Sequence, residues 1–596
     1  MLLGPVFQSE MVTTARRTRY FVLRVLFAAS LLLCLWGCYE GVTSWDNVEG
    51  RLSIRAAAQL AGSFFQSFAW LTLIAAIIVT PAIAAGAIAS ERERRTIEYL
   101  FATDLSNTEI VLSKLFGKLL LAAKLVLVAL PVLAIFRLLG GIPGNLLIVY
   151  FAGLASTVAL LTMGAMCISV WTARARDSII RVYLVVAMIF LLPIMLFLPL
   201  MATGGAGGWW ATQLSNVMSW CLEINPLWVL GQAVAGSGGL GVGLDASIIW
   251  RMVRIHLVLT VALAVVAIVA VRRVHLRSIS SPGAAVKRRW FVQFPQFRPA
   301  LRNRPMLWKE LFARTAATKF GFLGRISLAI IMIGTVGIAI WVYILMFSNP
   351  GGWWGSPGEQ YLQTSVSITC VLGVGSVILM GLRAAGLVTY EKERDCWLSL
   401  LSTPLTGAEI LGAKVVGNLY AFRWMLLPLM IIWFLQLTLS PQYVIAIPMH
   451  LATIGATGLF ATAVGLVYSL KFTSSLKAIG ATVGTLFFTG GGWMLCCCVP
   501  LMFGGGDDDI MKFAMAACVP FLQVMPGPIM VVEDIWRHDG AWMVIDYFVG
   551  TAGYAIAGMV ILSSIIGSFE TMVGRTGSNE ILGHPPRIAP TITPPE

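Results

Sequence analysis

Long apolar runs dominate this chain, and short polar segments separate them. Each run spans roughly 20 residues, enough for an α-helix to cross the hydrocarbon core of a bilayer. Because a bilayer offers the backbone no hydrogen-bond partner, such runs are predicted to be helices. In the amino-terminal half the pattern predicts six spans, at 20–40, 62–88, 115–138, 146–171, 178–203 and 249–271. In the carboxy-terminal half it predicts six more, at 322–347, 364–389, 416–440, 442–470, 479–503 and 541–568.

Composition and charge point to an all-α, polytopic integral membrane protein. Hydrophobic residues make up 58% of the 596 residues and charged residues only 12%, whereas soluble domains average roughly 25% charged residues. The formal net charge is +14, but the basic residues gather in loops that share one side of the predicted topology, which is the positive-inside pattern. We therefore expect a multi-pass protein of the cytoplasmic (inner) membrane with both termini cytoplasmic, in contact with the lipid bilayer and with no nucleic acid.

One segment of the chain, at 91–120, recurs in similar form and without a gap 300 residues later, at 391–420. The same offset relates Pro5 to Pro305, Glu10 to Glu310 and Pro226 to Pro526. This register predicts two fused copies of one membrane unit. The predicted organisation is a first six-span repeat at 1–275, a basic cytoplasmic linker at 276–303, a second six-span repeat at 304–575 and a disordered cytoplasmic tail at 576–596.

Each copy is predicted to form a helix, a break and a second helix at the membrane surface. Ser106 with Glu109, and Thr406 with Glu409, have the spacing of a capping box, in which hydroxyl and carboxylate satisfy the free N–H groups at a helix start. Pro404 marks the break, because proline pushes the preceding residue out of the helical region. We therefore expect each capping box to begin a helix that continues into the next span.

Charged side chains upstream of the capping boxes are spaced for pairing along one helical face, as with Glu91 and Arg95 or Arg94 and Glu98. The simplest interpretation is that a charged elbow anchors the spans to the lipid headgroups. Anchoring requires only amphipathic character, however. Glutamates that recur at 91/391, 93/393 and 109/409 indicate instead that a protein surface recognises those carboxylates.

The string E-x-E-R-x-T-x-E-x-L-x-x-T-x-L-S-x-x-E-I-x-x-x-K at 91–114 resembles the segment after the second span of ABC type-2 permeases, the membrane subunits of ATP-driven exporters. G-P-V-F-Q-S-E at 4–10 and R-P-M-L-W-K-E at 304–310 are similar to that family's interfacial helix, and N-P-L-W-V-L at 225–230 to its region after span five. The resemblance implies six helices per half, elbows that act as coupling helices against a nucleotide-binding subunit, and substrate passage between the halves.

The resemblance assigns roles to two sets of residues. Those expected to couple to the ATPase are Glu91, Glu93, Arg94, Thr103, Ser106, Glu109, Lys114, Glu391, Glu393, Arg394, Thr403, Thr406, Glu409 and Lys414. Those expected in the interfacial helices are Pro5, Glu10, Pro305 and Glu310. The two copies differ at several positions, for example Thr96 and Glu98 against Cys396 and Leu398. We therefore expect the two halves to contact their ATP-binding subunits, of which two copies are expected, unequally.

The energy source is predicted to lie on another protein. No G-x-x-x-x-G-K-[ST] motif occurs in the sequence, so the chain is expected to be no enzyme and to hold no cofactor, with ATP and magnesium on the partner. An ion-gradient-driven secondary transporter is disfavoured, since such carriers keep carboxylates within their spans and the predicted spans hold essentially none. A non-transporting membrane scaffold of the same fold stays open as a third interpretation.

Catalytic and metal chemistry are not predicted. The five histidines are scattered and lack metal-ligand spacing. The run Cys496-Cys497-Cys498 contains soft ligands, but adjacent helical residues point about 100° apart, so the three cannot share one face. Small buried hydrophobic residues are the better interpretation of this run.

If the coupling role is correct, charge reversal at Glu91 and Glu391 together should release the ATPase partner.

Overall fold

The protein is an all-α membrane protein, seen here in a computed structural model. The structure describes residues 18–43, 54–93, 96–127, 144–172, 177–179, 181–186, 208–235, 246–280, 305–312, 321–348, 357–492, 515–531 and 541–574, with the single residues 7, 8, 12 and 189. Within these ranges there are helices and no strand. Seven of the described helical stretches are long and apolar enough to cross a bilayer. The predicted fold class, an all-α multi-pass membrane protein, is thereby confirmed.

The helices of the amino-terminal half follow the order of the predicted spans. Their bounds are α2 (Thr18–Thr43), α3 (Ile54–Ala84), α6 (Asn107–Leu127), α8 (Gly144–Val170), α10 (Gly208–Ile224), α11 (Pro226–Ala235) and α12 (Ala246–Ser280). The first, second, fourth and sixth predicted spans correspond to α2, α3, α8 and α12. Most of the fifth predicted span and the end of the third lie outside the described residues.

The carboxy-terminal half repeats this order. Its bounds are α13 (Pro305–Phe312), α14 (Gly321–Ser348), α15 (Pro357–Ala384), α18 (Gly407–Ala421), α19 (Arg423–Leu439), η1 (Pro441–Val444), α20 (Ala446–Lys471), α21 (Ser475–Phe487), η2 (Phe488–Gly492), α24 (Val519–Val524), α25 (Pro526–Val531) and α27 (Ala541–Val573). The predicted uninterrupted helix over 479–503 is wrong, because the described helix turns at Gly491, whose φ of 122° is accessible to glycine. The cysteine run at 496–498 lies outside the described residues.

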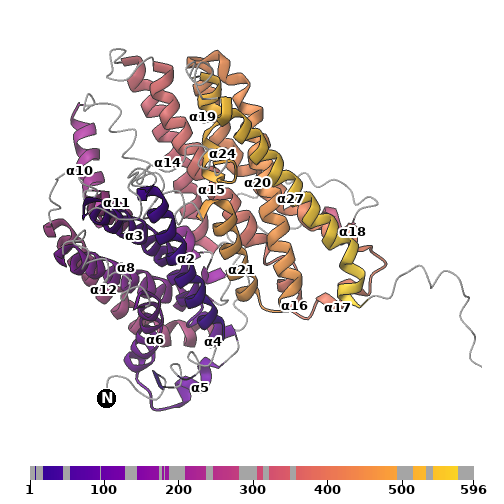
Figure 1. The fold of residues 1–596 in the computed structure, drawn as a ribbon. Coiled ribbons are helices and arrows are strands. Elements are labelled where there is room, and N and C mark those ends of the chain that lie inside the picture. The colour runs from indigo at the N-terminus through magenta and orange to yellow at the C-terminus, as the bar shows by residue number, and fades with distance from the viewer. Residues whose placement is uncertain are drawn as a thin grey trace, which may run out of the picture.

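The two halves pack against each other beside the ends of α3 and α15. One buried apolar cluster contains Ala84 and Ala85 from the first half together with Leu382, Ala385 and Ile479 from the second. In Figure 1 the indigo and purple helices of the first half accordingly lie beside α15 and α21 of the second. Movement of either half at this end therefore changes the contact between them.

Polar side chains tie neighbouring helices together inside the second half. The amide Nδ2 of Asn418 on α18 donates to the carbonyl of Met380 on α15 and to Oγ1 of Thr462 on α20, both at 3.0 Å. Hydrogen bonds between helices in a membrane each stabilise by roughly 0.6 kcal/mol. Close backbone approach adds to this at Gly465 of α20, where a Cβ would lie 2.6 Å from the Ala384 Cβ. The inner framework of α15, α18 and α20 is therefore closely joined.

Candidate functional site: the two elbows

Two short helical segments, here called the first elbow (85–109) and the second elbow (385–409), lie at the same end of the molecule (Figure 1). The first contains α4 (Ala89–Glu93) and α5 (Ile97–Ala102) and leads into α6. The second contains α16 (Thr389–Lys392) and α17 (Trp397–Leu401) and leads into α18. Each elbow thus connects the second membrane helix of its half to the third.

Each elbow has one more break than the sequence predicted. The expected break at Pro404 is present between α17 and α18. A second break separates α16 from α17, where Asp395 has a φ of 56° in the left-handed region. In the first elbow Thr96 lies in a turn directly before α5, so the prediction of one continuous charged helix is wrong. Residues 94 and 95, and with them Arg94, lie outside the described residues.

The capping boxes are confirmed in both elbows. Oε2 of Glu109 accepts from the Ser106 N–H at 2.9 Å, and the Glu109 N–H donates to the Ser106 hydroxyl at 3.2 Å. Oε2 of Glu409 accepts from the Thr406 N–H at 3.0 Å, and the Glu409 N–H donates to the Thr406 hydroxyl at 3.3 Å. These bonds satisfy the first free donors of α6 and α18. The backbone hydrogen bond from Ser106 lowers the pKa of Glu109 below its usual range.

A serine on the fourth membrane helix of each half caps the start of each elbow. The Ser169 hydroxyl accepts from the backbone N–H groups of Ile88 at 3.3 Å and Ala89 at 2.8 Å. The Ser469 hydroxyl accepts from those of Val388 at 2.8 Å and Thr389 at 3.0 Å. Sequence reasoning missed these serines, although they stand 300 residues apart in the register of the repeat.

Buried lysines hold the glutamates at 91 and 391. Lys114 Nζ lies 3.1 Å from Glu91 Oε1, and Lys414 Nζ lies 2.8 Å from Glu391 Oε1. The lysine side chains are only 4% and 1% exposed. In the first elbow the Thr96 hydroxyl also donates to the Glu91 carboxylate. These carboxylates therefore have partners within the chain and join each elbow to the helix that follows it.

The interfacial helix α13 extends this ion cluster in the second half. Glu310 Oε1 lies 3.7 Å from Lys414 Nζ, and Lys309 Nζ lies 3.7 Å from Glu391 Oε1. Pro305 begins α13, and its interfacial position stays a prediction. Gly417 admits the Glu310 side chain, because a Cβ at Gly417 would lie 2.7 Å from the Glu310 Cβ. Pro5 and Glu10, the corresponding residues of the first half, lie outside the described residues.

Glu393 binds the start of the fifth helix of its half. Its carboxylate accepts from the Ser475 N–H at 2.6 Å and from the Ser475 hydroxyl at 2.8 Å, which caps α21. The neighbouring Lys392 donates to the carbonyl of Leu470 at the end of α20. In the first elbow, Arg92 donates to the Thr172 carbonyl at 3.5 Å just after α8, and burial lowers the pKa of Arg92.

The short helices α5 and α17 rest on the end of the last membrane helix of their half. Phe101 contacts His275 of α12 with ring centroids 5.2 Å apart. Trp397 contacts Phe569 of α27 with ring centroids 6.2 Å apart. The Gly407 N–H also donates to Glu570 of α27 at 3.3 Å. Each elbow is thus in contact with the second, third, fourth and sixth membrane helices of its half.

The remaining predicted residues end the short helices or face outward. The hydroxyls of Thr103 and Thr403 donate to the carbonyls of Leu100 and Leu400, at 2.7 and 2.6 Å, at the ends of α5 and α17. Arg394 is exposed, and its guanidinium lies 4.3 Å from the centre of the Tyr390 ring.

One apolar side chain projects from each short helix, Tyr99 from α5 at 76% exposed and Leu398 from α17 at 77% exposed. We call these two side chains the tips. The tips are the side chains that point outward, because the neighbouring Ile97 and Trp397 face the bundle. The prominent outward-facing groups of the elbows therefore include these apolar tips, and not only the carboxylates that the sequence singled out.

Residues 51–272 match a family model described as ABC-2 family transporter protein. The matched segment runs from before α3 to within α12 and contains the whole first elbow. No curated protein matches the chain significantly.

Proposed function

We propose, from the match of residues 51–272 to the model of the ABC-2 family transporter protein, that the chain is an ATP-driven permease that exports a substrate across the cytoplasmic membrane. A permease of an ABC transporter, as a multi-pass membrane protein, pairs with ATP-binding subunits. In our proposal the elbows face the cytoplasm, and ATP binding by separate subunits moves them. ATP and magnesium are held by those subunits.

The observation that carries the proposal is the way in which each elbow is fastened. A helix that only anchors a span to the headgroups requires an apolar face and a polar face. The second elbow instead bonds to α18 through Lys414, to α20 through Ser469, to α21 through Glu393 and to α27 through Trp397. A push on this elbow therefore reaches four membrane helices, through contacts that range from the buried ion pair of Lys414 with Glu391 to the ring contact of Trp397 with Phe569.

The recurrence of these contacts supports a fused pair of permease units. The serine cap, the capping box and the lysine–glutamate pair each recur 300 residues later with the same atoms. The family model matches the first unit. In our proposal the second unit has the same role, so that two elbows receive two ATP-binding subunits.

The position of the elbows connects their movement to the contact between the halves. The elbows begin directly after α3 and α15. The apolar cluster between the halves contains Ala84 and Ala85 on one side and Leu382 and Ala385 on the other. Tilting the elbows would shift these residues relative to each other. We propose that this opens and closes a substrate path between the two halves.

The tips are the proposed docking groups for the ATP-binding subunits. Large apolar side chains that are about three-quarters exposed on a rigid element are suited to insertion into a groove of a partner. The two tips differ in chemistry, since Tyr99 carries a hydroxyl and Leu398 does not. The two docking contacts are therefore expected to be unequal.

Replacing both tips tests the proposal without disturbing the contacts inside the elbows. We expect the double variant Tyr99→Asp/Leu398→Asp to lose the ATP-binding protein that co-purifies with the tagged wild-type chain. A matched control, Thr108→Asp/Ala408→Asp, adds the same charges at exposed positions in the first turn of α6 and α18, where negative charge is tolerated. Retention of the ATP-binding protein by the tip variant, or equal loss from the control, would contradict the docking role.

A further inference from the structure

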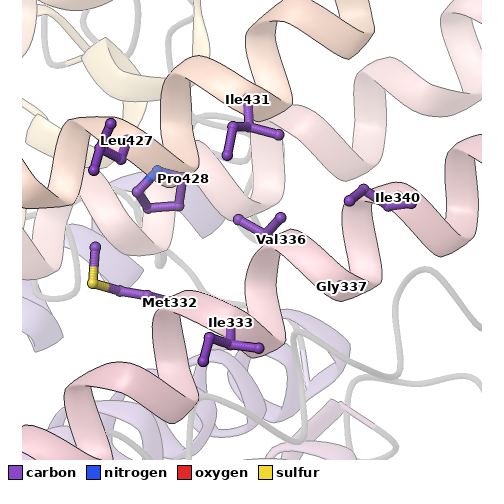
Figure 2. A pocket seen from close by; sticks show the side chains of 8 residues that line it. All are labelled: Met332, Ile333, Val336, Gly337, Ile340, Leu427, Pro428 and Ile431. Carbon is purple, nitrogen blue, oxygen red and sulfur yellow. The ribbon is translucent and has the colours of Figure 1, made fainter.

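A groove between α14 and α19 lies on the outer surface of the second half. It has a volume of about 430 Å³ and is lined by Met332, Ile333, Val336, Gly337, Ile340, Leu427, Pro428 and Ile431. Figure 2 shows the side chains of α14 and α19 on the two sides of this gap. All lining residues are apolar, and both helices belong to the apolar part of the chain, so the groove opens toward lipid.

The shape of the groove follows from two residues that remove bulk or bend a helix. Pro428 lies inside α19, where proline removes a backbone hydrogen bond and bends the helix. At Gly337 on α14 an added Cβ would meet no atom within 4 Å. Farther along, the two helices close on each other, since the Tyr343 and Thr438 hydroxyls lie 2.8 Å apart. This hydrogen bond joins the two helices beyond the groove, on the side away from the elbows.

A positively charged side chain stands at the elbow-side end of the groove. Arg423 is the first residue of α19 and is exposed. Its guanidinium lies 3.8 Å from the centre of the Tyr420 ring and donates to the Tyr420 carbonyl at 3.3 Å. In the part of the chain that the structure describes, no carboxylate forms an ion pair with it.

Arg423 and the groove share one face of α19. Leu427 and Ile431 follow Arg423 at four and eight residues, the spacing of one helical stripe. Eight residues rise about 12 Å, which is close to the roughly 15 Å depth of hydrocarbon in one leaflet. Beside Arg423, Trp424 is 58% exposed, and tryptophan is enriched at the level of the headgroups. The stripe therefore runs from the headgroup level into the leaflet on the elbow side.

We propose that this groove binds an anionic glycerophospholipid of the elbow-side leaflet, with one acyl chain against α14 and α19 and the phosphate at Arg423. Because no carboxylate among the described residues forms an ion pair with Arg423, its guanidinium favours a headgroup with net negative charge over a zwitterionic one.

The test uses the full chain in nanodiscs of phosphatidylcholine that contain phosphatidylglycerol with a photoreactive acyl chain. Cross-linked peptides are identified by mass spectrometry, and unlabelled phosphatidylglycerol and phosphatidylcholine with the same acyl chains compete. We expect cross-links on 332–340 and 427–431, with phosphatidylglycerol the better competitor by about fivefold, the effect of one basic side chain near a charged surface.

Four variants separate the headgroup contact from the groove. Arg423→Gln should abolish the preference for phosphatidylglycerol, whereas Lys471→Gln, at an exposed lysine that ends α20, should retain it. Gly337→Phe should fill the groove and remove the cross-links, whereas Gly553→Phe, at an exposed glycine of α27 with equal free space, should leave them.

Three results would overturn the proposal. The first is equal competition by the two lipids in the wild type, which would show general lipid contact. The second is an unchanged cross-link pattern in Gly337→Phe. The third is cross-linking between two protein chains through α14 and α19, which would show that a second copy covers the groove.

Discussion

Removing the buried charge at Lys414 should destabilise the second elbow. Its ammonium group is 1% exposed and lies 2.8 Å from Glu391 Oε1 and 3.7 Å from Glu310 Oε1. It also donates to the Leu387 carbonyl at 3.0 Å. In Lys414→Met both carboxylates lose this shared ammonium group, while the half-exposed Lys309 stays 3.7 Å from Glu391.

The size of the effect follows from the geometry. Removing one partner of a buried ion pair costs about 3–5 kcal/mol, because the remaining charge stays buried. In Glu391→Gln, by contrast, Lys414 keeps Glu310 and the Leu387 carbonyl, so the loss should be that of one charged hydrogen bond, about 1.5–3 kcal/mol. Residues in contact are not additive, so Glu391→Gln/Lys414→Met should cost less than the sum of the single variants.

Hydrogen exchange measures the local stability of the second elbow in the full chain. In the second elbow the amides of residues 388 and 389 donate to Ser469 of α20, and the amide of residue 396 donates to the Glu391 carbonyl. A cost of about 3 kcal/mol corresponds to exchange more than about a hundredfold faster. Lys414→Met should accelerate these amides and leave the matching amides of the first elbow unchanged. Unchanged exchange at 388–396, or a double variant that costs as much as the two single variants added, would refute the reasoning.

Three further variants test other contacts. Ser469→Ala leaves two buried N–H groups without their acceptor and should cost about 1–3 kcal/mol per group, seen as faster exchange at residues 388 and 389. The first turn of α6 should lose protection from exchange at acidic pH, because the Glu109 pKa is lowered in the folded state. The stabilisation by the Glu109 carboxylate is therefore complete above the pKa of the unfolded state and is lost as the pH falls through the pKa of the folded state. In Glu109→Gln the exchange of α6 should not vary with pH in this way. Gly465→Ala should lower the thermal unfolding temperature because its Cβ would meet α15, whereas Gly455→Ala on the same helix meets open space and should not.

Local patterns in the sequence were reliable guides to the elbows. The capping boxes and the helix that begins at Pro305 depend on residues within one or two turns, and both are present. The apolar pattern likewise located the helices that cross the membrane, because length and hydropathy alone set that requirement.

Contacts through space were beyond this kind of reasoning. Glu391 and Lys414 are both in the repeat, but 23 residues separate them, and only the fold shows that they pair. Ser469 comes to the elbow from α20, 80 residues away. The residue in the left-handed conformation is Asp395 and not a glycine, so the sequence does not predict this turn. Because the carboxylates are used inside the chain, release of a partner by charge reversal at Glu91 and Glu391 would not separate lost docking from a distorted elbow.

The most direct test of the account is the distance between the two elbows during ATP binding. Spin labels introduced by a genetically encoded amino acid at Thr108 and Ala408, both exposed, 300 residues apart and away from the tips, report this distance in the chain reconstituted with its co-purifying ATP-binding protein. The account predicts that ATP shifts the distance distribution when the partner is present and has no effect on the chain alone. An unchanged distance in the complete complex, or the same shift without the partner, would contradict it.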